Sequence, residues 1–596
     1  MKLKITLAIM FAFIGLSYAQ QNLPHIPKER PAYYEYLSEP DSFGNRTILR
    51  KEILSIERMK SNNMKLPYPI IFIHGLNSNS ATWNTTTSFL ISQYGLTCGG
   101  EFDYCLNYEG APYSSANTNF WPTTGADIAV FTGTWSSGDF YYVNFDVASD
   151  GTIFPSTNYT YNVESNQAAV AKQGAALSDA IYRVLQLTGR DKVILIGHSM
   201  GGLASREYLQ NPNLWQPDGQ AHVAKLATTG TPHGGSNQVT GGVLLSGVDC
   251  QSEAYRDLRT TYSGSGDPGV YLFGGVESNT VMNLSFCSNF YNIDVNCNGF
   301  TGETITGLDQ KNIYTDLDYS NIIGECSGCS GGQIPGDGIV LDVSANLNTY
   351  YPGLTTNLFY YNAFAILEIH RDLPGAIYQN MQGLDEPEYL NLAYHIGFDT
   401  SYTGFMTVPS AGDPNSPYDV DDYKFNVPSN SDVTVSVNNI IIALNFWVYI
   451  LDSNYNYVDS AFHQSGSLQS IQFTSTLNAG DYYLQIYAIP DANSYLTPYN
   501  FILNNSLTGI KENNMTNKIS IYPNPNNGSF TLSYHLSTIK NELQIKDVLG
   551  RTVYTYNLTG TDGKQNIDVS SLNNGVYFYS LKSGDNIETH KLIIEK

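Results

Sequence analysis

VILIGHSMGG, residues 193–202, is the most informative segment of the chain. It opens with four aliphatic residues typical of a buried strand, and a helix-forming stretch follows from Leu203. Ser199 stands between them at a turn flanked by glycines, which leave room where a strand and a helix approach closely. Such a strand–turn–helix exposes a serine hydroxyl to a base and directs backbone N–H groups at a reacting carbonyl. We therefore predict that Ser199 is a nucleophile.

A serine nucleophile needs a base and a carboxylate that orients the base. On a strand–turn–helix scaffold these follow in the chain order Ser, Asp or Glu, His. PGDGIVLDV places Asp337 in a glycine turn, and FAILEIHRD places His370 just beyond the last expected strand. We predict Asp337 as the acid and His370 as the base. Asp342 remains an alternative acid and His395 an alternative base.

Charge that develops on the substrate oxygen needs two preorganised donors. The backbone N–H of Met200, directly after the nucleophile, is the first candidate. The second is the N–H of Leu76, in the loop IFIHGLNSNSATW that follows an apolar strand, where Gly75 permits a tight turn. Three further histidines are expected to line the pocket or to be structural: His233 in the pocket wall, and His198 and His222 as structural residues.

Strands and helices alternate over residues 31–384, which predicts a mostly parallel sheet covered on both faces. Apolar runs at 70–73, 141–147, 193–196 and 223–227 predict strands, and helical spacing predicts a helix over 167–187. A Gly-, Ser- and Asn-rich insertion at 236–335 contains five cysteines. This stretch could be a lid over the site or a disulfide-stapled surface excursion, and the sequence leaves both open.

All seven cysteines lie between positions 98 and 329. In an exported protein disulfides are the default, although connectivity does not follow from sequence. Close spacing suggests three pairs and leaves Cys250 unpaired: Cys98 with Cys105, Cys287 with Cys297, and Cys326 with Cys329. No second close Cys/His pair supports a zinc site at Cys326 and Cys329.

The first 19 residues have the features of a secretory signal peptide: Lys2 and Lys4, an apolar stretch over 5–16, and Ser17-Tyr18-Ala19 before the cleavage point. The apolar stretch 440–451 is too short to span a membrane and is expected to form buried strands. We therefore expect no transmembrane segment in the mature chain. The formal net charge of −24 argues against nucleic acid as a partner.

Short alternating strands replace the helical pattern over 385–505 and predict an antiparallel β-sandwich. DVDDYKFNVP and LNAGDYYLQIYA in this segment resemble the bacterial pre-peptidase C-terminal domain, an accessory module of exported hydrolases. Asp419, Asp421 and Asp422 could bind calcium, but a solvated acidic turn is the favoured interpretation.

A polar linker precedes a second small β-sandwich over 516–596, with Pro-Asn and Asn-Gly turns. ISIYPNPNNGSFTL and QNIDVSSLNNGVYFYSLKSGD resemble the C-terminal sorting domain of the type IX (Por) secretion system. The resemblance implies export to the cell surface or the medium, with the secretion machinery as a partner.

PIIFIHGLNSNSATW, VILIGHSMGGLASREYL, LATTGTPHGGS and GDGIV resemble lipases and esterases of the α/β-hydrolase family, in particular triacylglycerol lipases and GPI inositol-deacylase-like enzymes. The resemblance implies an α/β-hydrolase fold over 31–384 and cofactor-free hydrolysis of esters, above all lipids, through an acyl-enzyme. Some such lipases bind structural calcium, but no ligands can be matched here. Two alternatives stay open: an amidase, peptidase or acyltransferase on the same triad, and a non-catalytic surface binding protein.

Overall fold

The structure is a computed structural model that describes most of the chain from residue 34 onward. The described residues are 34–40, 46–52, 64–106, 129–131, 133–147, 165–237, 252–260, 268–277, 281–284, 287–291, 294–297, 300, 302–329, 334–354, 356–377, 383–408, 418–491, 493–507, 518–536, 540–583 and 586–596. The predicted signal peptide lies outside them. The chain forms two compact units, Met1–Leu507 and Thr508–Lys596.

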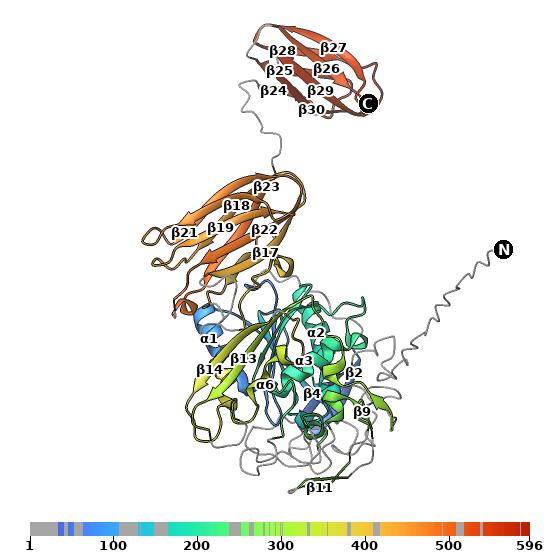
Figure 1. The fold of residues 1–596 in the computed structure, drawn as a ribbon. Helices are drawn as coiled ribbons and strands as arrows, with labels where there is room; N and C mark the ends of the chain where they lie inside the picture. Colours follow the sequence, from blue (N-terminus) through green and yellow to red (C-terminus); the bar gives the residue numbers. More distant parts are fainter. Residues whose placement is uncertain are drawn as a thin grey trace, which may run out of the picture. The chain divides into compact units, whose positions relative to one another are not determined.

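A ten-stranded sheet organises the first part of the larger unit, in the order β14-β13-β8-β7-β3-β6-β4-β5-β1-β2 (Figure 1). From β14 to β4 all neighbouring strands are parallel, as the sequence predicts for an α/β fold. The strands are β1 (Tyr34–Pro40), β2 (Arg46–Glu52), β3 (Ile70–Ile73), β4 (Cys98–Cys105), β5 (Ala129–Phe131), β6 (Phe140–Asn144), β7 (Val193–His198), β8 (Val223–Thr229), β13 (Asp318–Cys326) and β14 (Asn357–Ala363).

Helices cover both faces of this sheet. Successive strand residues point to opposite sides, so alternate residues of one strand pack against different helices. Ile70 and Phe72 of β3 pack in one apolar cluster with Leu90 of α1 (Asn84–Tyr94). Ile71 and Ile73 pack in another with α2 (Val170–Thr188). The second cluster also contains Tyr208 and Leu209 of α3 (Met200–Gln210). The strand that ends at Ser199 is therefore buried between two layers.

The expected insertion at 236–335 is more structured than the sequence analysis predicts. Its last part contains β13, which lies inside the central sheet between β8 and β14. The sequence of β13 lacks a simple apolar pattern because the strand buries polar residues whose hydrogen bonds are made within the fold. For example, Asn321 Nδ2 donates to Thr228 Oγ1 of β8. The remaining elements are short: α4 (Glu253–Asp257), α5 (Val270–Phe273), β9 (Gly275–Val276), β10 (Val281–Leu284), β11 (Cys287–Tyr291) and β12 (Thr304–Ile305).

A β-sandwich completes the larger unit, with sheets β15-β17-β22-β19-β20 and β16-β23-β18-β21 (Figure 1). Its core is continuous with that of the α/β part, because one cluster contains Phe72 and Leu90 together with Tyr402, Tyr423 and Val448. The strands are β15 (Tyr394–His395), β16 (Ser401–Gly404), β17 (Asp419–Val427), β18 (Ser431–Asn438), β19 (Phe446–Asp452), β20 (Tyr457–His463), β21 (Ser470–Leu477), β22 (Gly480–Ala488) and β23 (Tyr499–Leu507).

The smaller unit is a second β-sandwich with sheets β24-β25-β28 and β27-β26-β29-β30. Its core includes Leu532, Leu543, Ile545 and Leu592. The strands are β24 (Lys518–Tyr522), β25 (Ser529–His535), β26 (Lys540–Lys546), β27 (Thr552–Thr559), β28 (Asp562–Asp568), β29 (Gly575–Ser583) and β30 (Asn586–Ile594). Across the described residues of both units, no helix is long and apolar enough to cross a membrane.

Candidate active site

Ser199 occupies a sharp turn between β7 and α3, with φ 53° and ψ −124°. A positive φ is unfavourable for a residue with a side chain and persists only where the surroundings enforce it. Here the Ser199 N–H donates to Thr229 O at 2.9 Å, and the Gly202 N–H donates to Ser199 O at 3.1 Å. These two hydrogen bonds, one to β8 and one from α3, hold the serine in the strained conformation that the sequence predicts.

The glycines around Ser199 are required by close backbone approaches. A Cβ on Gly201 would lie 2.5 Å from the carbonyl oxygen of Ile73, at the end of β3. A Cβ on Gly197 would lie 2.5 Å from the Gly202 nitrogen. Because neither contact leaves room for a side chain, the glycines allow α3 to start directly beside the ends of β3 and β7.

Asp337 and His370 form a buried pair, and His370 Nδ1 lies 2.6 Å from Asp337 Oδ2. The other carboxylate oxygen, Oδ1, accepts hydrogen bonds from the backbone N–H groups of Ile339 at 2.9 Å and Val340 at 2.7 Å. The backbone of Ile369 also donates to Asp337 O at 2.9 Å. The carboxylate is therefore fixed on both oxygens, and the loop before His370 is attached to it.

The Asp337–His370 pair lies next to the end of β8, the strand that pairs with β7 before Ser199. A Cβ on Gly230, the residue after Thr229, would lie 3.0 Å from His370 Nδ1 and 3.1 Å from Asp337 Oδ2. The ring of His198, immediately before Ser199, is centred 4.8 Å from the ring of His370. The structure thus brings together the three residues that the sequence predicts as acid, base and nucleophile.

Two opposing effects act on the His370 imidazole. Burial alone lowers its pKa, but the charge of Asp337 and the hydrogen bond that His370 Nδ1 donates to Asp337 outweigh burial, and the pKa lies above its ordinary value. Asp337 therefore stabilises the imidazolium and fixes which nitrogen carries the proton. This is the electrostatic arrangement that a general base needs.

His198 has a role that the sequence analysis does not anticipate. Its Nε2 donates to the backbone oxygen of His370 at 3.0 Å, and its other ring nitrogen is buried without a partner. Burial and the charge of His370 hold the pKa of His198 well below its usual range, so the ring is neutral. His198 therefore positions the main chain of His370. A lone histidine gives no sequence signal for such a contact.

The loop after β3 lies against Ser199. A Cβ on Gly75 would lie 2.7 Å from the Ser199 Cβ, so the next residue, Leu76, starts beside the serine. His74 fixes this loop, because the Phe145 N–H donates to its Nε2 at 2.9 Å and its Nδ1 donates to Gly75 O at 2.8 Å. Burial lowers the pKa of His74 to about 4, which keeps the ring neutral in this arrangement.

Met200 begins α3, and the N–H groups of a helix's first turn have no acceptor within the helix. Its side chain packs with Leu203 of α3, Leu258 after α4, Leu272 of α5 and the half-buried Leu76. The described part of the insertion therefore packs directly against the start of α3, next to Ser199. Of the two interpretations that the sequence leaves open, this contact favours a covering element.

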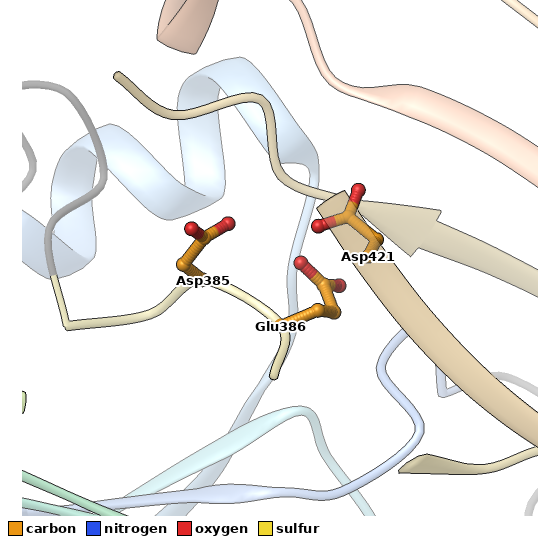
Figure 2. A group of neighbouring side chains, drawn as sticks. All are labelled: Asp385, Glu386 and Asp421. Atoms are coloured by element: carbon orange, nitrogen blue, oxygen red, sulfur yellow. The ribbon is translucent and has the colours of Figure 1, made fainter. Parts of the chain in front are cut away.

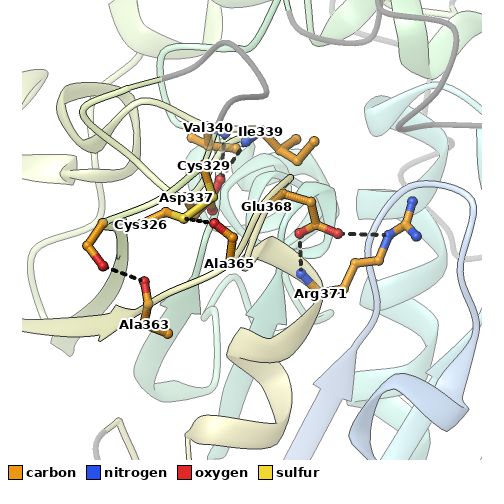
Figure 3. The surroundings of a disulfide bond; sticks show 10 residues. Cys326, Cys329, Asp337, Ile339, Val340, Ala363, Ala365, Glu368 and Arg371 are labelled. Carbon is orange, nitrogen blue, oxygen red and sulfur yellow. Dashed lines mark hydrogen bonds and ion pairs between the residues drawn. A yellow bond between two sulfur atoms is a disulfide. The ribbon is translucent and has the colours of Figure 1, made fainter.

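The disulfide prediction is confirmed for one pair and wrong for two. Cys326 and Cys329 are bonded (Figure 3). The Cys326 N–H donates to Gly336 O, next to Asp337, at 2.9 Å. Cys98, Cys105 and Cys297 are thiols. Cys98 and Cys105 are the two ends of β4, which separates them by about 23 Å, well beyond the reach of a disulfide. Cys250 lies outside the described residues.

The alternative site residues lie elsewhere. Asp342 begins α6 (Asp342–Ala345), and its Oδ1 accepts from the Val343 N–H. His395 is an exposed residue of β15, with its Nδ1 3.5 Å from Asp191. His233 is fully buried and contacts Thr228 and Arg206. His222 contacts the carbonyl of Asp191 and the carboxylate of Asp218.

The prediction of a solvated acidic turn at Asp419, Asp421 and Asp422 is wrong. All three lie on β17, and their side chains are buried. A strand places alternate residues on opposite faces, and here both faces are covered.

Three family models match successive parts of the chain. The PGAP1-like alpha/beta domain matches residues 67–246, the bacterial pre-peptidase C-terminal domain residues 419–488, and the secretion system C-terminal sorting domain residues 520–595. These matches agree with the α/β sheet and the two sandwiches described above.

Several solved structures are similar at low identity. The Bacillus licheniformis lipase BlEst2 in propeptide form is 13% identical over 95% of this chain and 97% of that chain, with a TM-score of 0.24. The product of gene lin2722 from Listeria innocua is 18% identical over 52% and 88%, with a TM-score of 0.27. The pre-peptidase C-terminal domain of a collagenase from Bacillus anthracis is 24% identical over 20% and 99%, with a TM-score of 0.15.

The sorting domain directs the chain through type IX secretion to the cell surface or the medium. The chain is thus an exported protein with an α/β-hydrolase fold, in which a PGAP1-like α/β domain is followed by a bacterial pre-peptidase C-terminal domain and a secretion system C-terminal sorting domain.

Proposed function

We propose that this protein is a hydrolase that cleaves carboxylic esters through Ser199, His370 and Asp337. The observation that carries the proposal is the 2.6 Å contact of His370 Nδ1 with Asp337 Oδ2, beside a serine held at a positive φ. A hydrogen-bonded base and acid next to an activated serine are the parts that acyl transfer needs.

In the first half-reaction, Ser199 Oγ attacks the ester carbonyl carbon while His370 Nε2 takes the hydroxyl proton. Asp337 stabilises the imidazolium through Nδ1. The backbone N–H groups of Leu76 and Met200 bind the oxyanion of the tetrahedral intermediate, each contributing on the order of 3 kcal/mol. When the intermediate collapses, the ester C–O bond breaks and His370 returns the proton to the departing alcohol.

In the second half-reaction, water attacks the Ser199 acyl ester and gives its proton to His370. The carboxylic acid leaves, and the proton returns to Ser199 Oγ. The cycle consumes one water for each ester bond and requires no redox partner.

Exposed apolar residues near His370 favour a substrate with an acyl chain. Phe364 and Leu367, in the loop between β14 and His370, are 76% and 49% exposed. Phe364 packs over Gly328, where a Cβ would lie 2.4 Å from its ring, in the loop closed by the Cys326–Cys329 disulfide. An apolar surface next to a catalytic loop is suited to contact with lipid.

The direct test compares purified wild-type chain with Ser199→Ala on p-nitrophenyl acetate, butyrate and palmitate. Ester hydrolysis predicts a loss of about ten-thousandfold or more in kcat for the variant. Equal rates in both proteins would overturn the proposal. A matched panel of acyl p-nitroanilides tests the amidase alternative, which predicts that the amides are cleaved faster than the esters.

A second experiment tests the lipid substrate. Phe364→Ser with Leu367→Ser should lower hydrolysis of emulsified triacylglycerol about thirtyfold, because about 2 kcal/mol of apolar contact is lost. Hydrolysis of soluble p-nitrophenyl acetate should not change. Leu468→Ser, which alters an exposed apolar side chain of the sandwich, is the control. Equal effects on both substrates would contradict an interfacial role of this loop.

A further inference from the structure

The loop that contains Leu76 is anchored on both sides of that residue. On one side, His74 Nδ1 donates to Gly75 O at 2.8 Å. The Gly75 carbonyl and the Leu76 N–H belong to one planar peptide unit, so this bond fixes the direction in which the N–H points. On the other side, Asn166 Nδ2 donates to Ser78 O at 3.3 Å. The segment between these two hydrogen bonds is therefore held at both ends.

Asn77, between the two anchors, has a left-handed backbone with a φ of 53°. Residues with a side chain rarely adopt this conformation, although asparagine does so more often than most. Such a conformation persists only where the surroundings enforce it. Loss of an anchor would let Asn77 relax to a negative φ, and this rotation would move the preceding residue, Leu76, relative to the rest of the loop.

Asp146 fixes the asparagine of the second anchor. It follows β6 and is 3% exposed. Its Oδ1 accepts from Asn166 Nδ2 at 2.8 Å, and Asn79 Nδ2 lies 3.5 Å from its Oδ2. The Asp146 N–H donates to Asn144 Oδ1 at 3.1 Å, at the end of β6. The carboxylate thus joins the loop residue Asn79 and the anchor Asn166 to the central sheet.

The orientation of the Asn166 amide follows from its neighbours. Both groups near its Nδ2, Asp146 Oδ1 and Ser78 O, are acceptors, so only the amide nitrogen can face them. Asn166 is fully buried, and its Oδ1 has no partner among the described residues. A buried oxygen without a hydrogen bond is costly. The two contacts of the nitrogen therefore determine how this side chain lies.

The Asp146 carboxyl is ionised in a slightly alkaline assay. Burial raises its pKa to about 6, and the hydrogen bond from Asn79 opposes this increase. At pH 8 both carboxylate oxygens are therefore acceptors. An asparagine at this position would replace one acceptor by an N–H donor, which would face the donor of Asn166 or of Asn79. Asp146→Asn is thus a nearly isosteric way to break the anchor.

We propose that Asp146 is a positioning residue, which holds the Leu76 N–H in place for the substrate oxyanion through Asn166 and Ser78 O. This inference rests on the proposed ester hydrolysis, in which Leu76 is one of the two oxyanion donors. A preorganised donor stabilises the charged transition state more than the bound ester. Loss of the anchor should therefore lower kcat and leave KM nearly unchanged.

Steady-state kinetics on p-nitrophenyl butyrate at pH 8 test this role, with Asp139→Asn as the matched control. Asp139 is a buried aspartate just before β6, at the opposite end of that strand, and it accepts from the backbone N–H groups of Lys65 and Thr97. Asp146→Asn should lower kcat about thirtyfold and change KM by less than about twofold, since outright removal of an oxyanion donor costs about a hundredfold or more. Asp139→Asn should lower the Tm at least as much but keep kcat within about twofold.

Binding of a transition-state mimic separates positioning from a general loss of structure. An alkyl trifluoromethyl ketone adds reversibly to a catalytic serine and places a charged oxygen where the oxyanion develops. Its inhibition constant should rise in Asp146→Asn by about the factor by which kcat falls. Asp139→Asn should bind the ketone as the wild type does.

A double-mutant cycle tests the path through Asn166. Asn166→Ala should lower kcat about as much as Asp146→Asn does. The double variant should lose no more than about twice the larger single loss, because both changes release the same contact with Ser78 O. Losses that multiply in the double variant would overturn the shared path.

Ser199→Ala distinguishes failure of this inference from failure of the proposed function. If the wild type and Ser199→Ala hydrolyse the ester equally fast, ester hydrolysis by Ser199 is wrong, and the role of Asp146 with it. If Ser199→Ala is inactive but Asp146→Asn retains the wild-type kcat, or raises KM alone, only the positioning role is wrong. Equal kcat losses in Asp146→Asn and Asp139→Asn would also overturn it. If Asp146→Asn does not fold, Asn166→Ala decides by the same criteria.

Discussion

Asp337 and Asp421 are both buried aspartates, each 1% exposed, but the groups around them differ in how far they compensate a negative charge. Asp337 accepts two backbone N–H groups on one oxygen and contacts His370 on the other. Asp421 accepts one hydroxyl, keeps one oxygen without a partner, and lies beside the carboxylates of Asp385 and Glu386 (Figure 2). The first group is compensated by the protein itself, whereas the second requires a proton or a cation.

This difference separates two functions of buried acids. A carboxylate with complete internal partners can remain charged and act on a neighbouring base throughout a reaction. A buried carboxylate with an unpartnered oxygen beside other carboxylates is costly to ionise. We therefore expect substitutions at Asp337 to alter catalysis and substitutions at Asp421 to alter stability.

The largest expected effect comes from Asp337→Asn. It should lower kcat for p-nitrophenyl butyrate by about ten-thousandfold, because the amide neither stabilises the imidazolium nor fixes its tautomer. Asp421→Asn, assayed below its unfolding temperature, should keep kcat within about twofold. The two rates are measured side by side at pH 8. Comparable losses in both variants would remove the distinction between the two acids.

The pH dependence of the wild type tests the same electrostatic arrangement. His370 must be neutral to accept the serine proton, and its pKa is raised above its ordinary value of about 6.5. The value of kcat/KM should therefore fall about tenfold per pH unit on the acid side, with a midpoint above about pH 6.5. Asp337→Asn should move the midpoint to lower pH, since burial then acts on His370 without compensation. A midpoint that does not move would contradict the assigned pairing.

A moderate effect is expected for His198→Leu, which removes the donor to the His370 carbonyl. Loss of one buried hydrogen bond of about 1 kcal/mol should lower kcat about fivefold to tenfold with little change in KM. His198→Gln, which retains an N–H donor, should recover part of the rate. The positioning role would be wrong if KM rose while kcat stayed constant, or if Gln and Leu behaved alike.

The smallest effect is expected for Cys326→Ser with Cys329→Ser. A disulfide that closes so short a loop contributes about 2 kcal/mol in the chain-entropy model. The double variant should therefore lower the Tm by a few degrees and leave kcat within about twofold, because Asp337 retains its own hydrogen bonds. Differential scanning fluorimetry and the esterase assay measure the two quantities. A kcat loss above tenfold would show that the disulfide supports the acid loop.

Much of the proposed site could be predicted because its signals are local. The strand, turn and glycines around Ser199 are contiguous, and the steric contacts of Gly201 explain why those residue types are needed. Asp337 and His370 could be selected because their order after the serine matches a known scaffold. The distance between them, and their place beside Ser199, required the folded sheet.

Other features could not be predicted because they depend on contacts across long stretches of chain. His198 bonds the main chain of a residue 172 positions away, which no spacing indicates. β13 contains polar residues that are satisfied only when β8 lies beside it, so its sequence is typical of a loop. The predicted Cys98–Cys105 disulfide was wrong because the two cysteines are the first and last residues of an extended strand. Residues that are close in sequence lie far apart in such a strand.

The acidic residues of β17 gave a partial signal. The motif DVDDY alternates acids with apolar residues within a strand, but the sequence does not show that both faces are covered. The partner acids, Asp385 and Glu386, precede β17 by more than 30 positions and meet Asp421 only when the sandwich packs on the α/β part.

Covalent labelling shows whether Ser199 is a nucleophile activated by His370 and Asp337. A fluorophosphonate ester reacts with an activated serine and adds one group of defined mass. Intact-mass and peptide analysis of the wild type should show a single adduct on Ser199. Labelling should be strongly slowed in His370→Ala and absent from Ser199→Ala. An adduct on another residue, or equal labelling of the wild type and Ser199→Ala, would contradict the account.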